Sequence, residues 1–365
     1  MSNSADTDTQ ARARAPVYQR RRRRIYASIA IVAVVVAAAV VWTVTRSSPG
    51  PGALPSFTIA YGQGNIASSD SIIDSDQAIA NTIPAHLHFV PFDAGVTAIA
   101  EMRSGDLQAI SGVGNPPVVG AIGTNTGVDV VIAQSFDDDG LVVPKTITLP
   151  AQLAGKSVAV LVGSSEDYEL RGWLELEHLT ASVKVIGFTS EQAAAAAYLA
   201  GDVTAAYVAG GPELQLEQKG GHVLTDAPAI AKQGIPGINV VAVSQRLVHT
   251  DPALVQKYVC AEVQATRLFT GPQGARYLTQ SAKVQGVPGN LIVQATRSYP
   301  FIPLDQQLHW LGSATGDVNS PIVKAYVLTG QFLVGQGRLT AAPTASAVAS
   351  HIDPEFIKNA LAGDC

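Results

Sequence analysis

The stretch that decides the fold is LAGKSVAVLVGSSEDY, residues 153–168. Its apolar run Ser157–Val162 has the length and the valine content of a buried strand. Gly163 then turns the chain into a helical pattern that begins at Ser164. A strand that leads directly into a helix is the repeating unit of α/β proteins, so this stretch predicts an α/β fold.

A second stretch, LQAISGVGNPP (107–117), has the same arrangement, with a strand that ends at Gly114 and a helix that opens with Asn115-Pro116. The first backbone N–H groups of a helix lack partners within it and lie at the positive end of its dipole, so each helix start is a candidate anion site. The structural alternative is that Ser164 and Asp167 form a capping box and that the proline merely suits a first turn. The sequence does not show whether the two helix starts face each other.

Strand and helix patterns alternate over the rest of the chain. Apolar runs typical of strands lie at 57–61, 107–112, 128–133, 157–162, 183–188, 205–208 and 238–243, with helical patterns at 94–104, 116–124, 166–179, 190–200 and 212–219. Helices alone follow at 251–269, 271–282, 288–297, 304–316, 319–331 and 354–361. This order predicts two α/β lobes with parallel sheets covered by helices on both faces, and a helical tail packed on one lobe.

The charge is unevenly distributed. Residues 1–46 carry eight Arg and two Asp, a net charge of +6, whereas the other 319 residues carry 16 basic and 27 acidic groups, a net charge of −11. So acidic a body would repel phosphate backbones, which argues against nucleic acid as a partner.

An uncharged run, residues 25–45, follows five consecutive arginines. As a helix it would extend roughly 31 Å, enough to cross a membrane, and the arginines would keep the N-terminus cytoplasmic. We therefore expect a basic cytoplasmic tail (1–24), a transmembrane signal anchor (25–45) and a linker (46–54). The protein would be a single-pass cell-membrane protein with its main domain extracytoplasmic. A cleaved signal peptide is the alternative.

Several short motifs, taken in their order and spacing, resemble the periplasmic binding proteins of taurine and aliphatic-sulfonate ABC importers. They are Phe92-Asp93-Ala94-Gly95, Ser104-Gly105-Asp106-Leu107-Gln108, Gly114-Asn115-Pro116-Pro117, Leu141-Val142-Val143, residues 153–159, Gly201-Asp202-Val203, Ala206-Tyr207-Val208 and residues 220–226. The resemblance covers roughly residues 57 to 361. Single motifs are shared with nitrate and thiamine-precursor binding proteins.

The resemblance implies a type II periplasmic-binding-protein-like fold, in which two α/β lobes joined by two hinge strands close on a ligand. By analogy, lobe 1 comprises 55–143 with 246–361, and lobe 2 comprises 144–245. The implied function is that of the extracytoplasmic solute-binding subunit of an ABC importer that captures a small organic anion, most readily taurine or an aliphatic sulfonate. Its partners would be the permease and ATPase subunits, and no cofactor is implied.

The resemblance also implies a set of ligand contacts, because sulfonate oxygens in this family lie on helix starts and loop amides. The expected ligand-binding residues are Gln63, Gly114, Asn115, Asp139, Ser164, Ser165, Tyr168, Tyr207 and Asn239.

Two positions depart from the family's pattern. The taurine binders have a pair of serines where this chain has Asn115-Pro116, and an aspartate for the ligand's ammonium group where it has Asn239. An amide cannot supply the charge pairing that an ammonium requires in a dry cleft, so we expect a preference for an amine-free sulfonate. Glu166 and Asp167 either bring negative charge close to the expected anion or only complement a helix dipole.

Catalysis is not expected. Enzymes of this fold, a sulfinate desulfinase and a pyrimidine-forming relative, use cysteine or histidine clusters. Here Cys260 lies in an apolar helical pattern and Cys365 is the last residue, so the two are either free thiols or a disulfide. The seven histidines lack metal-ligand spacing, and Asp137–Asp139 lacks the alternation of a calcium loop and predicts a solvated turn.

Two alternative functions stay open. One is a membrane-anchored envelope interaction protein that has kept the fold without a transport ligand. The other is a binder of a different small solute, of the nitrate or thiamine-precursor class. Hydrogen-bond donors that converge on the cleft would argue for a solute.

Overall fold

The computed structural model describes residues 54–62, 68–92 and 94–365. The predicted basic tail (1–24), the predicted anchor (25–45), almost all of the linker (46–54) and Gln63 lie outside the described residues. Within the ranges described, none of the helices has both the length and the apolar character needed to cross a membrane.

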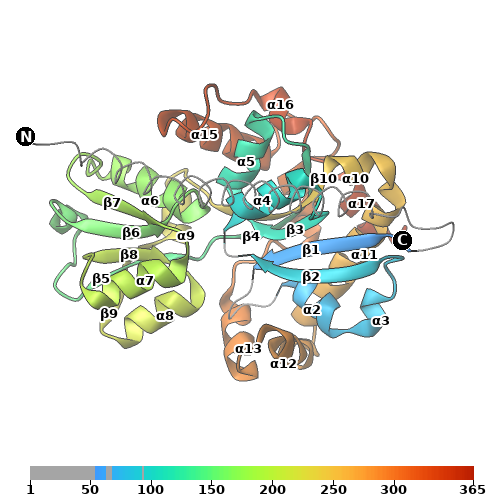
Figure 1. Ribbon diagram of the computed structural model, residues 1–365, viewed down its shortest axis with the longest axis horizontal. Helices are drawn as coiled ribbons and strands as arrows, with labels where there is room; N and C mark the ends of the chain where they lie inside the picture. The colour runs from blue at the N-terminus through green and yellow to red at the C-terminus, as the bar shows by residue number, and fades with distance from the viewer. Residues whose placement is uncertain (1–53, 63–67, 93) are drawn as a thin grey trace, which may run out of the picture. The chain divides into compact units, whose positions relative to one another are not determined.

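The strands form two five-stranded sheets (Figure 1). The order is β2-β1-β3-β10-β4 in the first sheet and β7-β6-β8-β5-β9 in the second. The bounds are β1 Ser56–Gly62, β2 His86–Phe92, β3 Ala109–Val113, β4 Val128–Phe136, β5 Gly140–Pro144, β6 Ser157–Leu161, β7 Lys184–Phe188, β8 Ala205–Val208, β9 Gly221–Asp226 and β10 Ile238–Ser244. We call the first sheet and the helices packed on it lobe 1, and the second sheet with its helices lobe 2.

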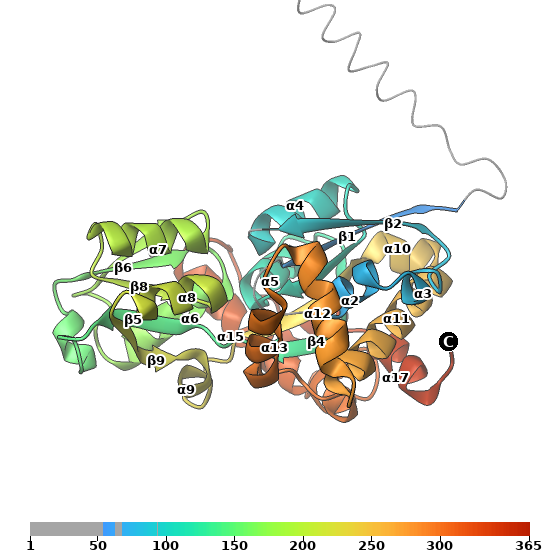
Figure 2. The ribbon, with the colours of Figure 1, turned by 90° about the horizontal axis from the view of Figure 1, so that it is seen from below.

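Helices connect and cover the strands. Those of the first part of the chain are α2 Ser69–Ser75, α3 Gln77–Ala80, α4 Gly95–Ser104, α5 Asn115–Gly123, α6 Ser165–Leu176, α7 Glu191–Ala200, α8 Gly210–Gln218, α9 Ala227–Ala231 and α10 Gln245–Thr250. They are followed by α11 Pro252–Thr270, α12 Gly274–Gln285, α13 Gly289–Ser298, α14 Gln307–Leu311, α15 Pro321–Gly335, α16 Ala345–Ala349 and α17 Glu355–Ala362, and short 3₁₀ turns lie at Pro150–Leu153 and Leu304–Gln306. In lobe 2, α6 and α9 pack on one face of the sheet, and α7 and α8 on the other (Figure 2).

The prediction of parallel sheets is wrong for one strand in each sheet. β10 runs antiparallel to β3 and β4, and β5 runs antiparallel to β8 and β9. The chain reaches each of these strands from the other lobe: β5 follows β4 through residues 137–139, and β10 follows β9 and α9. Two successive strands of one sheet run parallel when a helix between them carries the chain back to the starting end of the first strand. β5 and β10 instead receive the chain directly from the other lobe, at the opposite end of their sheet, and therefore run antiparallel to their neighbours.

Capping residues define the start of α6 and the end of α7. Ser164 is the N-cap of α6, and its Oγ accepts a hydrogen bond from the backbone N of Asp167 at 3.3 Å. Asp167 Oδ2 in turn accepts from the backbone N of Gly163 at 3.0 Å, so the predicted capping box is shifted by one residue. Helix α7 ends at Gly201, whose φ of 80° is the left-handed conformation that glycine adopts without strain.

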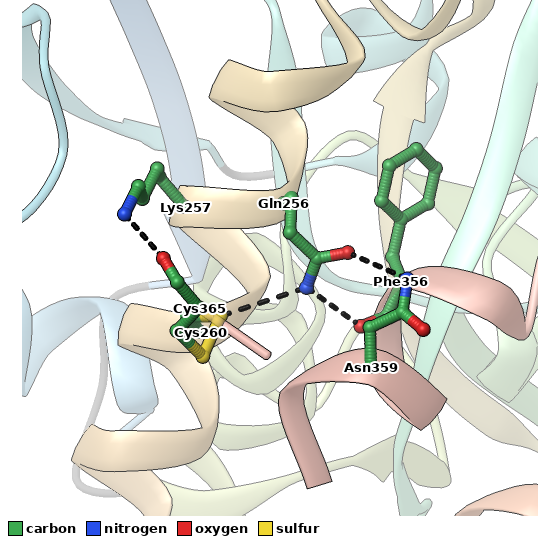
Figure 3. Close-up of a disulfide and its surroundings, with 6 residues drawn as sticks. All are labelled: Gln256, Lys257, Cys260, Phe356, Asn359 and Cys365. Carbon is green, nitrogen blue, oxygen red and sulfur yellow. Dashed lines mark hydrogen bonds between the residues drawn. A yellow bond between two sulfur atoms is a disulfide. The ribbon is translucent and has the colours of Figure 1, made fainter. Parts of the chain in front are cut away.

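A disulfide joins Cys260 on α11 to Cys365 at the end of the chain (Figure 3). Beside it, Gln256 Nε2 donates to the carbonyl oxygen of Phe356 at 3.0 Å, and Asn359 Nδ2 donates to Gln256 Oε1 at 3.3 Å. Phe356 and Asn359 lie on α17, and Gln256 Nε2 also donates to Cys260 Sγ of the disulfide at 3.5 Å. The disulfide and these bonds therefore hold the C-terminal helix and the tail against α11.

Candidate ligand-binding site

A cavity of about 390 Å³ is lined by residues of both lobes. The C-terminal ends of the strands and the helix starts that follow them supply much of its wall, as in other open α/β folds. Lobe 1 contributes Gly62, Phe92, Gly95, Gly112, Gly114, Pro117, Asn239 and Tyr299; lobe 2 contributes Leu161, Ser164, Ser165, Glu166, Glu191, Gln192 and Ala209 to Pro212; and the connecting run Asp137, Asp138 and Asp139 completes it.

The two helix starts that the sequence singled out meet at this cavity. A Cβ atom placed on Gly114, the N-cap of α5, would lie 2.6 Å from Ser165 Oγ at the start of α6. This approach is closer than side chains tolerate, so the absence of a side chain at Gly114 permits the contact. The structure thus brings together the strand-to-helix turns that the sequence could identify only singly.

Of the nine residues expected to contact the ligand, five line the cavity. They are Gly114, Asp139, Ser164, Ser165 and Asn239. Their roles in binding remain predictions.

Asn115 belongs to the framework rather than to the cavity wall. It is fully buried, its Nδ2 donates to the carbonyl oxygen of Pro236 at 2.9 Å and to Thr329 Oγ1 at 3.2 Å, and its Oδ1 accepts from the backbone N of Ile238 at 3.0 Å. Both ends of the amide are occupied within the protein, and Asn115 is not among the described residues that line the cavity; its expected contact with the ligand stays a prediction.

The two expected tyrosines also lie behind the wall. Tyr168 packs edge to face on Phe332 of α15, with ring centroids 5.2 Å apart. Tyr207 is fully buried, and its hydroxyl donates to Glu169 Oε2 at 2.9 Å. In this structure Tyr207 orients a buried carboxylate and Tyr168 connects α6 to α15, and their expected contacts with the ligand stay predictions.

The run Asp137–Asp139 is not the solvated turn that its sequence predicts. It forms the passage from β4 to β5, where both lobes cover it, and Asp137 and Asp139 are only 5% and 4% exposed. Asn239 Nδ2 donates to Asp137 Oδ1. Asp137 Oδ2 and Asp139 Oδ2 have no hydrogen-bond partner.

Other carboxylates surround this run. Glu166 and Glu191 line the cavity at the starts of α6 and α7, and Glu191 Oε2 accepts from the backbone N of Ala209 at 2.9 Å. Glu169 lies deeper, where it accepts hydrogen bonds from Tyr207 and, at 3.0 Å, from the backbone N of Gly237. Among the described lining residues there is no Lys, Arg or His to balance these charges.

Burial raises the pKa values of the carboxyl groups in the cavity wall, because no basic side chain among the described lining residues stabilises their charged forms. It raises the pKa of Asp137 to about 7, with the charge of Glu166 as the second cause, and that of Asp138 to about 6. It raises the pKa of Glu191 to about 8, again with a contribution from Glu166. The pKa of Asp139 rises well above its ordinary value, first through burial and then through the neighbouring charges.

One carboxylate near the cavity has its own cations. Asp167 Oδ1 accepts from Arg171 Nε at 2.6 Å, and Asp167 Oδ2 accepts from Arg338 Nη2 at 2.9 Å. Arg171 lies on α6, whereas Arg338 follows α15, which packs on α5 of lobe 1. This ion pair therefore bridges the lobes.

One group of oxygens has the spacing of a metal site. One oxygen from each of Asp137, Asp139 and Glu169 lies within 4.8 Å of the others. Oxygen ligands of this kind suit hard divalent cations. Both oxygens of Glu169 already accept hydrogen bonds, however, which leaves two unpartnered oxygens to coordinate an ion.

Sequence reasoning missed the acidic character of the cavity. Glu191 follows a strand at the start of a helix, the same signal that identified Ser164, and Asp137 follows the end of β4. Asp137 was expected in a solvated turn and Glu191 was not singled out, because no sequence signal shows that these residues are covered in the folded protein.

No family model matches the chain. In sequence it is 25% identical to the taurine-binding periplasmic protein of Escherichia coli (strain K12) over 308 residues, which are 82% of this chain and 92% of that protein. In fold it matches the periplasmic aliphatic sulphonate binding protein SsuA from Escherichia coli, with a TM-score of 0.65, 19% identity, and coverage of 85% of this chain and 100% of that one.

The fold is also found in an enzyme. The desulfurization enzyme DszB matches with a TM-score of 0.57 and 18% identity over 85% of this chain and 100% of its own. Both cysteines of the present chain are joined in the disulfide, and no histidine is among the described residues that line the cavity. The comparisons favour a binding protein.

The expected localisation, a single-pass protein of the cell membrane, is wrong. The sequence relative is named a periplasmic protein. The described residues contain no helix able to span a membrane, and the predicted anchor lies outside them. The expectation of a membrane span at residues 25–45 rested only on the length and the apolar composition of that run.

The motifs, the sequence relative and the fold agree. The chain is similar to the periplasmic binding proteins of taurine and aliphatic sulfonates, the family that its sequence motifs resemble.

Proposed function

We propose that the protein is the solute-binding subunit of an ABC importer. It captures a small solute in the cavity between its lobes and delivers the solute to a permease that a separate ATPase subunit drives. The proposed class of solute is that of taurine and the aliphatic sulfonates, after which the sequence relative and the structural neighbour are named.

The observation that carries this proposal is the meeting of two helix starts, one from each lobe, at a single cavity. Gly114 opens α5 and Ser164-Ser165 open α6, and all three line the cavity. Backbone N–H groups in a first turn are free of intrahelical partners. In α6, Ser165 and Glu166 offer such donors, whereas Pro116 and Pro117 have no N–H and leave Asn115 as the donor in the first turn of α5. The two turns can still hold a polar group of a solute from both sides. A solute held in this way would favour the closed arrangement of the lobes.

Calorimetric titration of the full-length protein tests the proposal. Taurine, ethanesulfonate, sulfate and an unrelated amino acid such as leucine are titrated separately into protein shown to be folded by circular dichroism. We expect at least one organic solute to bind with a Kd in the micromolar range or below, and leucine not to bind. Failure of every small solute, including the amines named below, would contradict a role as a solute-binding subunit.

A further inference from the structure

We propose that the solute recognised by this cavity carries an organic cation, an ammonium or guanidinium group, which is held by Asp137 and Asp139 at the passage between the lobes. The inference rests on the proposed role as a solute-binding subunit and narrows its solute: it retains taurine, which carries an ammonium group, and sets aside the aliphatic sulfonates that carry none. It reverses the sequence-based expectation of an amine-free sulfonate.

The first argument is the charge of the wall. Asp137, Asp138, Asp139, Glu166 and Glu191 all line the cavity, and its described lining contains no basic side chain. A sulfonate would meet carboxylates from lobe 2 and from the connecting run with no basic side chain beside them, whereas a cation would be attracted from several sides.

The second argument is the state of two carboxylate oxygens. Asp137 Oδ2 and Asp139 Oδ2 are buried and lack hydrogen-bond partners, although both residues line the cavity. A buried carboxylate oxygen without a donor is costly, and charge-assisted N–H···O⁻ bonds from a ligand would offset that cost. These two oxygens are therefore acceptors that a donor-rich solute would satisfy.

The third argument is that the protein's own carboxylates already occupy donors that an anion would use. Glu191 Oε2 accepts from the backbone N of Ala209, at the N-cap of α8. Asp167 Oδ2 accepts from the backbone N of Gly163, immediately before α6. One carboxylate of the protein thus lies at the start of α8 and another at the turn before α6, and their negative charge weakens the case for an anion there.

The fourth argument distinguishes an organic cation from a metal ion. The cavity volume of about 390 Å³ far exceeds that of one ion, and Phe92, Tyr299 and Leu161 add aromatic and apolar surface to the wall. Aromatic faces attract ammonium and guanidinium groups, and the apolar surface suits their methylene chains. A metal ion would find only the two unpartnered oxygens.

The test is calorimetric titration of the full-length protein with agmatine, putrescine, taurine, ethanesulfonate and CaCl₂. We expect an amine-bearing compound to bind at least about tenfold more tightly than ethanesulfonate. Replacement Asp139→Asn removes one carboxylate with little change of shape and should weaken amine binding about tenfold or more. Asp202→Asn, at an exposed position after α7 in the same lobe, is the matched control and should leave the affinity unchanged.

The outcomes separate this inference from the proposed function. Binding of ethanesulfonate as tight as that of the amines, or equal amine affinity in the Asp139→Asn and Asp202→Asn variants, would overturn the cation assignment and leave a solute-binding subunit in place. Binding of Ca²⁺ alone would also overturn the assignment, in favour of a metal site. If no compound binds to the folded protein, both proposals fail.

Discussion

Gly114 occupies a position where any side chain would press against the other lobe. The nearest atom to an added Cβ is Ser165 Oγ at 2.6 Å, whereas a Cβ on Gly120, two turns further along α5, would meet nothing within 4 Å. The contact between the lobes therefore requires the absence of a side chain at Gly114 but not at Gly120.

Gly114→Ala should weaken solute binding, because the added methyl group would force the lobes apart and raise the free energy of the closed arrangement. We expect an affinity loss of about tenfold, equivalent to about 1.4 kcal/mol. Calorimetry with the tightest ligand of the panel measures the change. Gly120→Ala serves as the control, and equal affinities for the two variants would contradict a role for Gly114 in closure.

At the scale of elements, α11 and the C-terminal tail form one unit. Cys260 and Cys365 are 105 residues apart in the sequence, and the loop that their bond closes includes α12 to α17. Closing so long a loop restricts the unfolded chain strongly. A disulfide of this kind persists in oxidising compartments outside the cytoplasm.

Reduction of this disulfide should lower the free energy of unfolding by about 3–5 kcal/mol. Urea unfolding of the full-length protein, followed by circular dichroism with and without reductant, measures the loss. The double variant Cys260→Ser, Cys365→Ser should be as unstable as the reduced protein and insensitive to reductant. Reductant sensitivity in that variant would show that another effect is responsible.

At the scale of the whole molecule, contacts between the lobes set the arrangement seen here. Arg338 bonds to Asp167 of α6, whose carboxylate is fully buried, and Tyr168 packs on Phe332 of α15. Neither Arg338 nor Phe332 is among the described residues that line the cavity, so each can be replaced without removing a lining side chain.

Arg338→Ala should loosen closure of the lobes and leave Asp167 with Arg171 as its remaining cation. We expect a loss of about 1–3 kcal/mol in the free energy of unfolding, a larger radius of gyration in X-ray scattering and a several-fold loss of solute affinity. Lys358→Ala breaks an exposed pair with Glu355 and is the control, since such pairs contribute little. Unchanged scattering and affinity in Arg338→Ala would exclude this bridge as a determinant of closure.

The stability of the ligand-free protein should fall as pH rises from about 4 to about 8. A carboxyl group whose pKa is raised by folding binds its proton more tightly in the folded protein than in the unfolded chain, so raising the pH favours unfolding over this interval. The groups that contribute are Asp137, Asp138, Asp139, Glu166, Glu169, Glu191 and Glu213 at the cavity and beside it, and Asp70 and Glu262 in the core of lobe 1.

Urea unfolding at pH 5, 6, 7 and 8 measures this dependence. Glu191→Gln should flatten the curve, because it removes a group whose pKa burial raises to about 8. Glu101→Gln, at an exposed position on α4, should not change the slope. A stability that rises over this interval would contradict the raised pKa values.

Sequence reasoning located most elements close to their observed bounds. The helical pattern expected over 190–200 is α7 at Glu191–Ala200, and the strand expected over 205–208 is β8. The expected strands do not include β2, at the edge of the first sheet, nor β5 and β9. The last two border the passages between the lobes. Their pairing depends on the antiparallel entry of the chain from the other lobe, which no local pattern encodes.

The sequence by itself determined the α/β character, the two strand-to-helix turns and the resemblance to sulfonate-binding proteins, because these depend on local periodicity, capping residues and motif order. Only the tertiary structure decided that Gly114 and Ser165 meet, that Asn115 and Tyr207 face inward, and that Asp137 and Asp139 are buried without a cation. Burial and charge balance arise from segments far apart in the chain. The run Asp137–Asp139, which the sequence predicts to be a solvated turn, therefore lies in the wall of the cavity with Asp137 and Asp139 buried.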